Sequence, residues 1–329
     1  MAVGIFSKGI LKTVPYLEVF LQDKVVLNPK SPKQVNAIAG WGHKPTAKKA
    51  MQKAKEWGLP YLALEDGFIR SFGLGFEEPP LSIVIDPVGI YYDASKPSMI
   101  ENLLNSNHWQ SPEILEKAKT LRDLIVKYEI SKYNNTLDLP SQIKELLQKE
   151  ESILLVDQTY NDMSVILGGA DQNTFKEMLY SALEENPKAL IVIKTHPDVI
   201  KGKKRGFLTN LRVPKNRLVL SENYNPIQLL KLVKKVYTVS SQMGLEALLL
   251  GKEVHCFGVP FYAGWGLTYD RKKTERRKRK VSIEELVASA YLLYPRYVIP
   301  KGNQYKLCDV FEVLDFFGCK KKAETGKIN

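Results

Sequence analysis

The sequence of 329 residues lacks any long apolar run. No stretch approaches the roughly 20 apolar residues that a membrane-spanning helix needs. The N-terminal segment has no extended hydrophobic region followed by a small-residue cleavage site, so no secretory signal is expected. The three cysteines, Cys256, Cys308 and Cys319, have no metal-ligand spacing and form no disulfide framework. These absences predict a protein of the reducing cytoplasm.

Acidic residues are in deficit, because 48 Lys and Arg stand against 36 Asp and Glu and give a formal net charge of +12. Such an excess indicates anionic partners. The densest basic runs are 201–205 and 271–280. Neither run carries interleaved aromatic residues that would stack on bases, and no nucleic-acid-binding motif is present, so nucleic acid is not expected. Each run is either a solvated surface or, for 271–280, a contact with anionic lipid headgroups.

The expected elements divide the chain into two halves of different character. In the first half, short apolar runs predict strands at 3–6, 24–27, 37–41 and 59–64, and a strand pair at 82–85 and 89–92. Helices are predicted at 46–57, ending at Gly58, from Pro112 to about Tyr133, and at 140–150.

The second half alternates regularly between strands and helices. Strands are predicted at 152–156, 189–194, 217–221, 236–240 and 253–257, with helices at 174–186, 226–233 and 244–250. This alternation indicates a parallel sheet with helices on both faces. Such sheets bind ligands outside the carboxyl ends of their strands. Helical patterns at 282–293 and 309–317 close the chain.

Polar residues gather at two of these strand ends. They are Lys194, His196 and Pro197 after one strand, and Ser240, Ser241, Gln242, Gly244 and Glu246 after another. Hydroxyls and backbone N–H groups at a helix N-terminus suit a phosphate, and a histidine donor suits the same group. Taken separately, a His-Pro pair is usually a turn and a Ser-Ser pair an N-cap. Together they predict a site for a nucleoside monophosphate leaving group, without a metal.

Two acidic pairs also follow expected strands, one pair in each half. Glu65 and Asp66 come after the strand at 59–64, and Asp157 and Asp162 come after the strand at 152–156. Each acid taken alone could cap a turn. One pair in each domain suits a reaction in a cleft between two domains.

Five separated motifs resemble those of the KpsC/LipB family of capsule Kdo transferases, Kdo being an eight-carbon acidic sugar. They are LEDGFIRSFGLG at 64–75, VDQTYNDMS at 156–164, KTHP at 194–197, SSQMGLEAL at 240–248 and FGVPFYAGWGLT at 257–268. The similarity runs from about Ala37 to Thr268. Members of the family usually carry two such modules in tandem. This chain has the length of one, and its VDQT motif resembles that of the N-terminal module.

The resemblance implies an α/β, GT-B-like fold. An N-terminal acceptor-binding Rossmann-like domain is expected at 1–150 and a C-terminal donor-binding one at 151–300, facing a central cleft. The segment 301–329 is expected to pack back on the N-terminal domain, with 309–317 as a crossover helix.

The resemblance also implies the reaction. The donor would be CMP-β-Kdo and the acceptor a Kdo-terminated glycolipid of the phosphatidylglycerol type. The product would be the oligo-Kdo linker of capsular polysaccharide, with retained configuration and, by the same resemblance, β-2,4 linkage. No metal cofactor is expected. A second Kdo transferase module in the full-length protein is expected, together with a peripheral position on the inner face of the inner membrane.

Retention implies a double displacement through a covalent Asp-Kdo intermediate. By resemblance, Asp162 is the expected nucleophile, with Asp157 as the alternative. Glu65 is the expected general base, with Asp66 as the alternative.

The remaining expected roles concern donor binding. Lys194 and His196 would hold the phosphate or the Kdo carboxylate, Ser240 and Ser241 the phosphate, and Glu246 the ribose hydroxyls. Arg70 is either a partner of a sugar carboxylate or a structural ion pair. Tyr262 and Trp265 either line the donor pocket or pack within a Gly-rich loop.

Two other functions stay open at this point. The Glu-Asp-Gly, His-Pro and Ser-Ser motifs are also similar to those of bacterial sialyltransferases, so an inverting CMP-sialic acid transferase is the first alternative. A module that binds nucleic acid or membrane without catalysis is the second.

Overall fold

The computed structural model describes residues 2–73, 78–200, 202, 204–209, 217–220 and 222–325, without the side chains of 197, 200 and 319–325. The chain forms two units. Unit 1 comprises Met1–Ile90, Lys96–Asn135 and Val287–Asn329, and unit 2 comprises Tyr91–Ser95 and Thr136–Leu286. These ranges differ from the expected 1–150, 151–300 and 301–329. Helix α6 (Ser141–Lys149) packs against α10 (Pro226–Leu232) in unit 2, and residues 295–297 pair with a strand of unit 1.

Unit 1 contains a seven-stranded mixed sheet in the order β13-β12-β5-β4-β3-β1-β2. Its strands are β1 (Ala2–Ile5), β2 (Lys24–Leu27), β3 (Ala37–Trp41), β4 (Tyr61–Asp66), β5 (Ser82–Asp86), β12 (Pro295–Lys301) and β13 (Gln304–Cys308). Strands β1 to β4 run parallel, whereas β5, β12 and β13 continue the sheet in antiparallel pairs. The first five strands occupy the positions that the apolar runs predicted.

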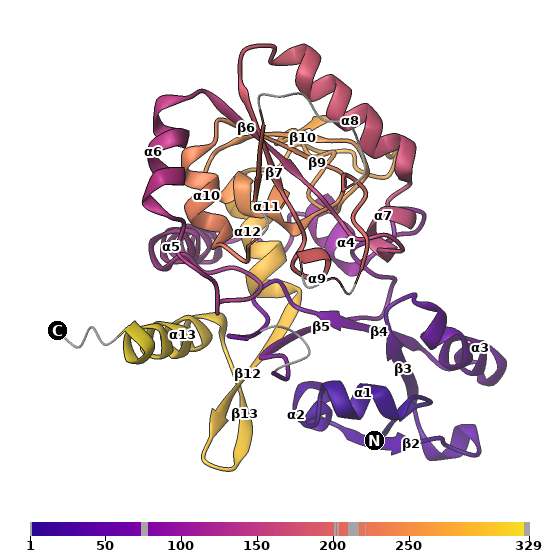
Figure 1. The fold of residues 1–329 in the computed structure, drawn as a ribbon. Helices are drawn as coiled ribbons and strands as arrows, with labels where there is room; N and C mark the ends of the chain where they lie inside the picture. The colour runs from indigo at the N-terminus through magenta and orange to yellow at the C-terminus, as the bar shows by residue number, and fades with distance from the viewer. Residues whose placement is uncertain are drawn as a thin grey trace. The chain divides into compact units, whose positions relative to one another are not determined.

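Some helices of unit 1 begin or end at residues that cap them. They are α1 (Lys8–Thr13), α2 (Leu17–Leu21), α3 (Lys48–Trp57), α4 (Met99–Asn105), α5 (Pro112–Tyr128) and α13 (Val310–Thr325). The Ser111 hydroxyl caps α5 by accepting from the Ile114 N–H, and Gly58 ends α3 with a φ of 64°. Helix α13 packs against β12 and α5 (Figure 1).

Two predictions in the first half were wrong. Residues 89–92 form no strand, because Asp86 accepts hydrogen bonds from the Val88, Gly89 and Met99 N–H groups and closes a loop there. Helix α5 ends at Tyr128 rather than near Tyr133. The backbone beyond it is hydrogen-bonded to the segment that follows β4. The Asn134 N–H donates to Phe72 O, and the Asn134 side chain donates to Ser71 O.

The hairpin of β12 and β13 was not predicted. Lys301 pairs with Gln304, so the loop consists of Gly302 and Asn303 alone, and Gly302 has a φ of 59°. A two-residue loop with glycine at a positive φ is a recognised hairpin signal. Exposed lysines interrupt the alternation of apolar and polar residues in both strands, so the sequence pattern did not predict them.

Unit 2 contains a six-stranded sheet, parallel throughout, in the order β11-β10-β9-β6-β7-β8. Its strands are β6 (Ser152–Val156), β7 (Leu190–Lys194), β8 (Arg217–Leu220), β9 (Lys235–Thr238), β10 (Glu253–Cys256) and β11 (Tyr269–Asp270). Ser221, expected to end a strand, lies outside the described residues. The predicted alternation and parallel pairing are confirmed.

The helices of unit 2 are α6, α7 (Met163–Ile166), α8 (Gln172–Glu185), α9 (Pro197–Ile200), α10, α11 (Gln242–Leu249) and α12 (Ile283–Val287), whose last residue belongs to unit 1. Helix α8 covers one face of the sheet and α10 and α11 the other (Figure 1). A π-helical segment, Ala288–Leu293, follows α12. Among the helices that the structure describes, none is long and apolar enough to cross a membrane.

The core of unit 2 on the α8 side is built around Phe175. Its side chain is fully buried, and its ring stacks on Phe207 with 4.2 Å between centroids. Phe207 in turn stacks on Tyr160 at 4.5 Å. This aromatic column ties α8 to the segments that follow β6 and that precede β8.

Replacing Phe175 by alanine should lower the free energy of unfolding by about 3–5 kcal/mol, because it removes a buried ring and leaves a cavity. Chemical denaturation followed by fluorescence measures the change. Tyr180 on the same helix is 64% exposed, so Tyr180→Ala serves as the control and should change the value by about 0.5 kcal/mol or less. Equal effects of the two substitutions would contradict the assignment of the core.

Candidate active site

The order in which the chain adds strands to the sheet of unit 2 reverses between β6 and β9. From β6 the chain proceeds to β7 and β8 on one side, and then returns to place β9, β10 and β11 on the other. Open parallel sheets bind ligands at such a switch point, outside the carboxyl ends of the strands. The residues that follow these two strand ends are therefore the first candidates for chemistry in unit 2.

Gln158 connects the two strand ends through its carboxamide. The side chain is only 3% exposed. Its Oε1 accepts from the Ser240 N–H at 2.9 Å, and its Nε2 donates to Ser240 Oγ at 3.1 Å and to Asp162 Oδ2 at 3.3 Å. A buried amide with both ends engaged has one defined orientation. Gln158 was not predicted as a site residue, because an amide has no acid, base or nucleophile role that would single it out.

Asp162 is the half-buried N-cap of α7. Its Oδ1 accepts from the Ser164 N–H at 2.9 Å and from Ser164 Oγ at 2.8 Å. Ser164 Oγ lies 3.0 Å from Ser240 Oγ. Asp162, Ser164, Gln158 and Ser240 thus form one continuous network, and Ser164 is a second member that the sequence did not reveal.

Asp157 has a different environment. It is 3% exposed, and its Oδ1 accepts from the Gln158 and Leu208 N–H groups, both at 2.9 Å. A Cβ on Gly206 would stand 2.1 Å from Asp157 Oδ2, so only glycine fits there. Burial raises the pKa of the Asp157 carboxyl to about 6, against the hydrogen bonds that it accepts. This carboxyl fastens the 206–208 segment to the end of β6.

The N-terminus of α11 is rigidly supported. Ser241 caps it by accepting from the Met243 N–H at 3.2 Å, and the buried Tyr262 hydroxyl donates to Ser241 O at 2.5 Å. Gly244 provides the room for that hydroxyl, since a Cβ there would lie 2.2 Å from it. Burial raises the pKa of Tyr262 well above its ordinary value. Tyr262 therefore packs beneath the helix terminus, and its place in the donor pocket stays a prediction.

Other members of the predicted donor site lie close by in the chain. Gln242 Nε2 donates to Glu246 Oε1 at 3.2 Å, and Glu246 is 2% exposed. Trp265 is fully buried and its indole N–H donates to Phe261 O at 2.8 Å, so this ring packs within its loop.

Lys194 and His196 follow β7. Lys194 is 5% exposed and donates to Glu222 O at 2.9 Å. Burial lowers the pKa of Lys194 to about 8, although the charge of Glu222 opposes the shift. His196 Nδ1 accepts from the Asp198 N–H at 3.1 Å, which places the proton of the neutral ring on Nε2. Pro197 begins α9, and its side chain lies outside the described residues.

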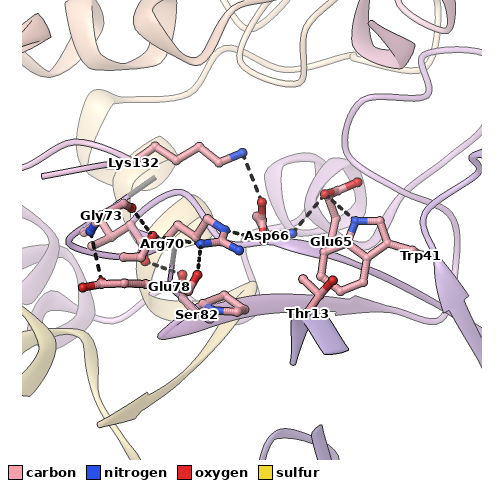
Figure 2. A network of polar contacts seen from close by, with 12 residues as sticks. Thr13, Trp41, Glu65, Asp66, Arg70, Gly73, Glu78, Ser82 and Lys132 are labelled. Carbon is pink, nitrogen blue, oxygen red and sulfur yellow. Dashed lines mark hydrogen bonds and ion pairs between the residues drawn. The ribbon is translucent and has the colours of Figure 1, made fainter. Parts of the chain in front are cut away.

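In unit 1, Glu65 lies near the end of β4 and is 5% exposed. Its Oε1 accepts from the Trp41 indole N–H at 2.9 Å, and its Oε2 pairs with Lys44 Nζ at 2.9 Å. Figure 2 shows Trp41 approaching Glu65 from the side opposite to Lys132. Both partners come from segments about 20 residues away, so nothing local in the sequence pointed to them.

Asp66 belongs to a separate ion-pair cluster (Figure 2). Its Oδ1 lies 2.8 Å from Arg70 Nε, and its Oδ2 lies 3.7 Å from Lys132 Nζ. Arg70 is 1% exposed and also donates to Ser71 Oγ at 2.9 Å and Glu78 O at 2.8 Å. These contacts match the structural ion pair, which was the second interpretation of Arg70. Residues 74 and 75 of the same motif lie outside the described residues.

A small hollow lies at the carboxyl ends of β1 and β3, where unit 1 has its own switch point. Trp41 is part of its wall and also donates to Glu65, so the hollow and this carboxylate share one side chain. The hollow is lined by Phe6, Ser7, Ile10, Ala39, Gly40, Trp41, Thr46, Ala47 and Ala50. The lining thus combines small side chains with two aromatic rings and two hydroxyls.

The basic run 271–280 is partly structural. Arg277 donates to Pro260 O and Ala263 O, both at 2.6 Å, and lies over the Trp265 ring; Arg276 donates to Ala94 O at 2.6 Å. The exposed side chains include Lys273, Lys278 and Lys280. In the other run, Lys201 and Lys203 lie outside the described residues. Within the described ranges, no group of three or more His, Cys, Asp or Glu side chains is placed to hold a metal ion.

The chain belongs to the family of capsule polysaccharide biosynthesis proteins, whose sequence pattern matches residues 36–297. The capsule polysaccharide modification protein LipA of Neisseria meningitidis serogroup B is 43% identical over 325 residues, which are 96% of this chain and 45% of LipA. The lipopolysaccharide-processing protein LpsZ of Rhizobium meliloti is 38% identical over 80% of this chain and 60% of its own length. The chain thus spans less than half of LipA. The predicted family membership is confirmed.

Two solved structures are similar to the chain over almost its whole length. The β-Kdo 2,4 transferase of Thermosulfurimonas dismutans KpsC is 56% identical, with a TM-score of 0.92, and the match covers 96% of this chain and 98% of that one. The β-Kdo 2,7 transferase of the same KpsC is 31% identical, with a TM-score of 0.73, over 98% and 99%. The predicted α/β, GT-B-like class with two Rossmann-like sheets is confirmed. The central cleft and the crossover helix stay predictions.

The buried carboxyl of Asp157 should make folding stability depend on pH. Its pKa of about 6 in the folded protein lies above the value of about 4 expected in the unfolded chain. The folded state therefore binds more protons in this window, and its stability falls as pH rises from 4 to 6. Relative to wild type, Asp157→Asn should gain about 2–3 kcal/mol of unfolding free energy across that window. Denaturant titrations at several pH values test this, and parallel curves for both proteins would contradict it.

Proposed function

We propose that this chain is a retaining β-Kdo glycosyltransferase module of capsule biosynthesis. It takes Kdo from CMP-β-Kdo and extends the oligo-Kdo linker on a Kdo-terminated glycolipid of the phosphatidylglycerol type. The network around Asp162 at the β6/β9 switch point carries the proposal, in a chain 56% identical to a β-Kdo 2,4 transferase. The lower identity of 31% to the 2,7 transferase favours the β-2,4 linkage.

The CMP phosphate is assigned to the N-terminus of α11. Ser241 accepts from the Met243 N–H, so its own hydroxyl proton is available to a phosphate oxygen. His196 Nε2 is a second donor, and Lys194, with its pKa near 8, adds positive charge to the phosphate or to the Kdo carboxylate. These protein groups take the place of a divalent metal in the proposal. Glu246 is assigned to the ribose hydroxyls.

Asp162 is the better nucleophile of the two candidates. Asp157 is buried, and its carboxylate is occupied by the backbone of its own unit, whereas Asp162 is half-buried. The Asp162 carboxylate attacks the anomeric carbon, and the bond from that carbon to the CMP phosphate oxygen breaks. The acceptor hydroxyl oxygen then attacks the same carbon and displaces Asp162. Two inversions give net retention.

Glu65 is assigned as the general base that takes the proton of the acceptor hydroxyl. Trp41 and Lys44 fix its carboxylate, whereas Asp66 is held between Arg70 and Lys132 and is less suited to the task. The acceptor sugar is assigned to unit 1 because this carboxylate lies there, near the end of β4.

The covalent step can be tested by intact-protein mass spectrometry. Glu65→Gln incubated with CMP-Kdo should gain the mass of one Kdo, because it forms the adduct but cannot activate the acceptor. Asp162→Asn should gain nothing, and Asp157→Asn, the matched control, should still react. An adduct that persists in Asp162→Asn would move the nucleophile elsewhere.

Competition between donors separates this proposal from its alternatives. Wild type should prefer CMP-Kdo to CMP-sialic acid and give a product with retained configuration. Preference for CMP-sialic acid with an inverted product would replace the proposal by a sialyltransferase. Salt-dependent binding of RNA or anionic vesicles without consumption of either donor would indicate a binding module.

We propose further that the exposed lysines of 271–280 hold the protein against the anionic inner face of the inner membrane, near its lipid-linked acceptor. Lys273, Lys278 and Lys280 remain exposed, whereas Arg276 and Arg277 bind backbone carbonyls. Each lysine near such a surface contributes about 1 kcal/mol. A second Kdo transferase module in the full-length protein belongs to the same proposal, and the chain's 45% share of LipA leaves room for one.

Changing Lys273, Lys278 and Lys280 together to glutamate should abolish co-sedimentation with phosphatidylglycerol vesicles at moderate salt, because attraction turns into repulsion. The control changes Lys33, Lys119 and Lys176, which are also exposed, and so alters the net charge equally. Equal loss of binding in both triple variants would show that overall charge, not this segment, is responsible.

A further inference from the structure

We propose that Ser240 and Ser164 are positioning residues for the nucleophile, and that they make Oδ2 of Asp162 the attacking atom. This inference rests on the proposed function, because it needs Asp162 to be the nucleophile. It changes the role expected of Ser240, from a ligand of the donor phosphate to a member of a hydrogen-bond chain that ends on Asp162.

The direction of the hydrogen-bond chain follows from counting the hydroxyl protons of its two serines. A carboxylate oxygen only accepts, so the contact of 2.8 Å between Ser164 Oγ and Asp162 Oδ1 uses the single proton of the Ser164 hydroxyl. Ser164 Oγ must then accept in its contact of 3.0 Å with Ser240 Oγ. The Ser240 proton is thereby directed to Ser164, and only the longer contact of 3.4 Å to Gln158 Oε1 competes for it.

Gln158 contacts every member of this hydrogen-bond chain, since its Nε2 also lies 3.3 Å from Ser164 Oγ and from Asp162 Oδ2. The Ser240 N–H donates to Gln158 Oε1 at 2.9 Å, which turns Nε2 toward Ser240 Oγ at 3.1 Å. The Ser240 oxygen accepts there while its proton points away to Ser164. Each donation in such a chain polarises the next, so the bond that reaches Asp162 is strengthened.

The two carboxylate oxygens of Asp162 consequently differ in the hydrogen bonds that they accept. Oδ1 accepts two short bonds from Ser164, at 2.9 and 2.8 Å, whereas Oδ2 accepts one long bond of 3.3 Å from Gln158 Nε2. The less engaged oxygen keeps the more available lone pair. When Oδ2 bonds to the anomeric carbon and the phosphate oxygen of CMP leaves with its electron pair, Oδ1 becomes the ester carbonyl oxygen. Ser164 can still donate to it.

Ser241 provides the contrast with its neighbour. Its Oγ accepts from the Met243 N–H at 3.2 Å, and so its proton is not consumed by that contact. Two adjacent serines at one helix terminus thus have opposite tasks. Ser241 faces the phosphate, and Ser240 faces the nucleophile.

The test compares Ser164→Ala, Ser240→Ala and Ser241→Ala in two measurements, the rate of CMP release in the first turnover with CMP-Kdo and the dissociation constant for CMP. Ser164→Ala should slow adduct formation about 10- to 100-fold, as expected when a hydrogen bond to a charged group is lost, with CMP affinity within twofold of wild type. Ser240→Ala should slow it about 3- to 10-fold, also with unchanged CMP affinity. Ser241→Ala should instead weaken CMP binding.

Ser164→Thr retains the hydroxyl and should recover most of the rate lost in Ser164→Ala, which a merely structural role would not predict. Thermal unfolding of each variant identifies any that fails to fold. If Ser240→Ala weakens CMP binding as much as Ser241→Ala does, the inference is overturned. The measurement of CMP binding needs no reaction, so it can overturn this inference by itself. Absence of any adduct in wild type would instead count against the proposed function.

Discussion

The reversal of strand order between β6 and β9 is the constraint on which the chemistry of unit 2 depends. It brings two strand ends together that are about 80 residues apart in the chain. The Gln158 carboxamide bridges them, and through it the backbone of one strand end sets the position of an acid on the other. Burial of the amide makes this bridge specific, because any other orientation would leave a buried donor or acceptor unpaired.

Much of this arrangement could be predicted from sequence because strand ends of a parallel sheet meet at one edge. The parallel sheet, the Ser240–Ser241 helix start and the two acid pairs followed from that rule. What could not be predicted depended on contacts between distant segments. Gln158 and Ser164 have residue types without catalytic chemistry of their own. Lys44 and Lys132 reach Glu65 and Asp66 from loops that no local pattern connects to them.

The adjacent acids of unit 1 show how packing separates residues that sequence treats alike. Alternate side chains on a strand point to opposite faces, so Glu65 and Asp66 meet different partners. Glu65 contacts an indole and one half-exposed lysine, whereas Asp66 contacts a guanidinium that is almost fully buried. A buried arginine needs a carboxylate, and Arg70 takes Asp66 for that purpose. A role of Arg70 in binding a sugar carboxylate stays a prediction.

The chain passes between the two units four times, at residues 90, 95, 135 and 286. Strand β5 of unit 1 pairs with β12, which lies more than 200 residues later in the chain. During synthesis on the ribosome, this edge of β5 therefore emerges unpaired and stays so until residues 295–297 have been made. Such an edge is prone to pair with other chains. Pairing with β12 therefore closes an edge that would otherwise stay open to other chains.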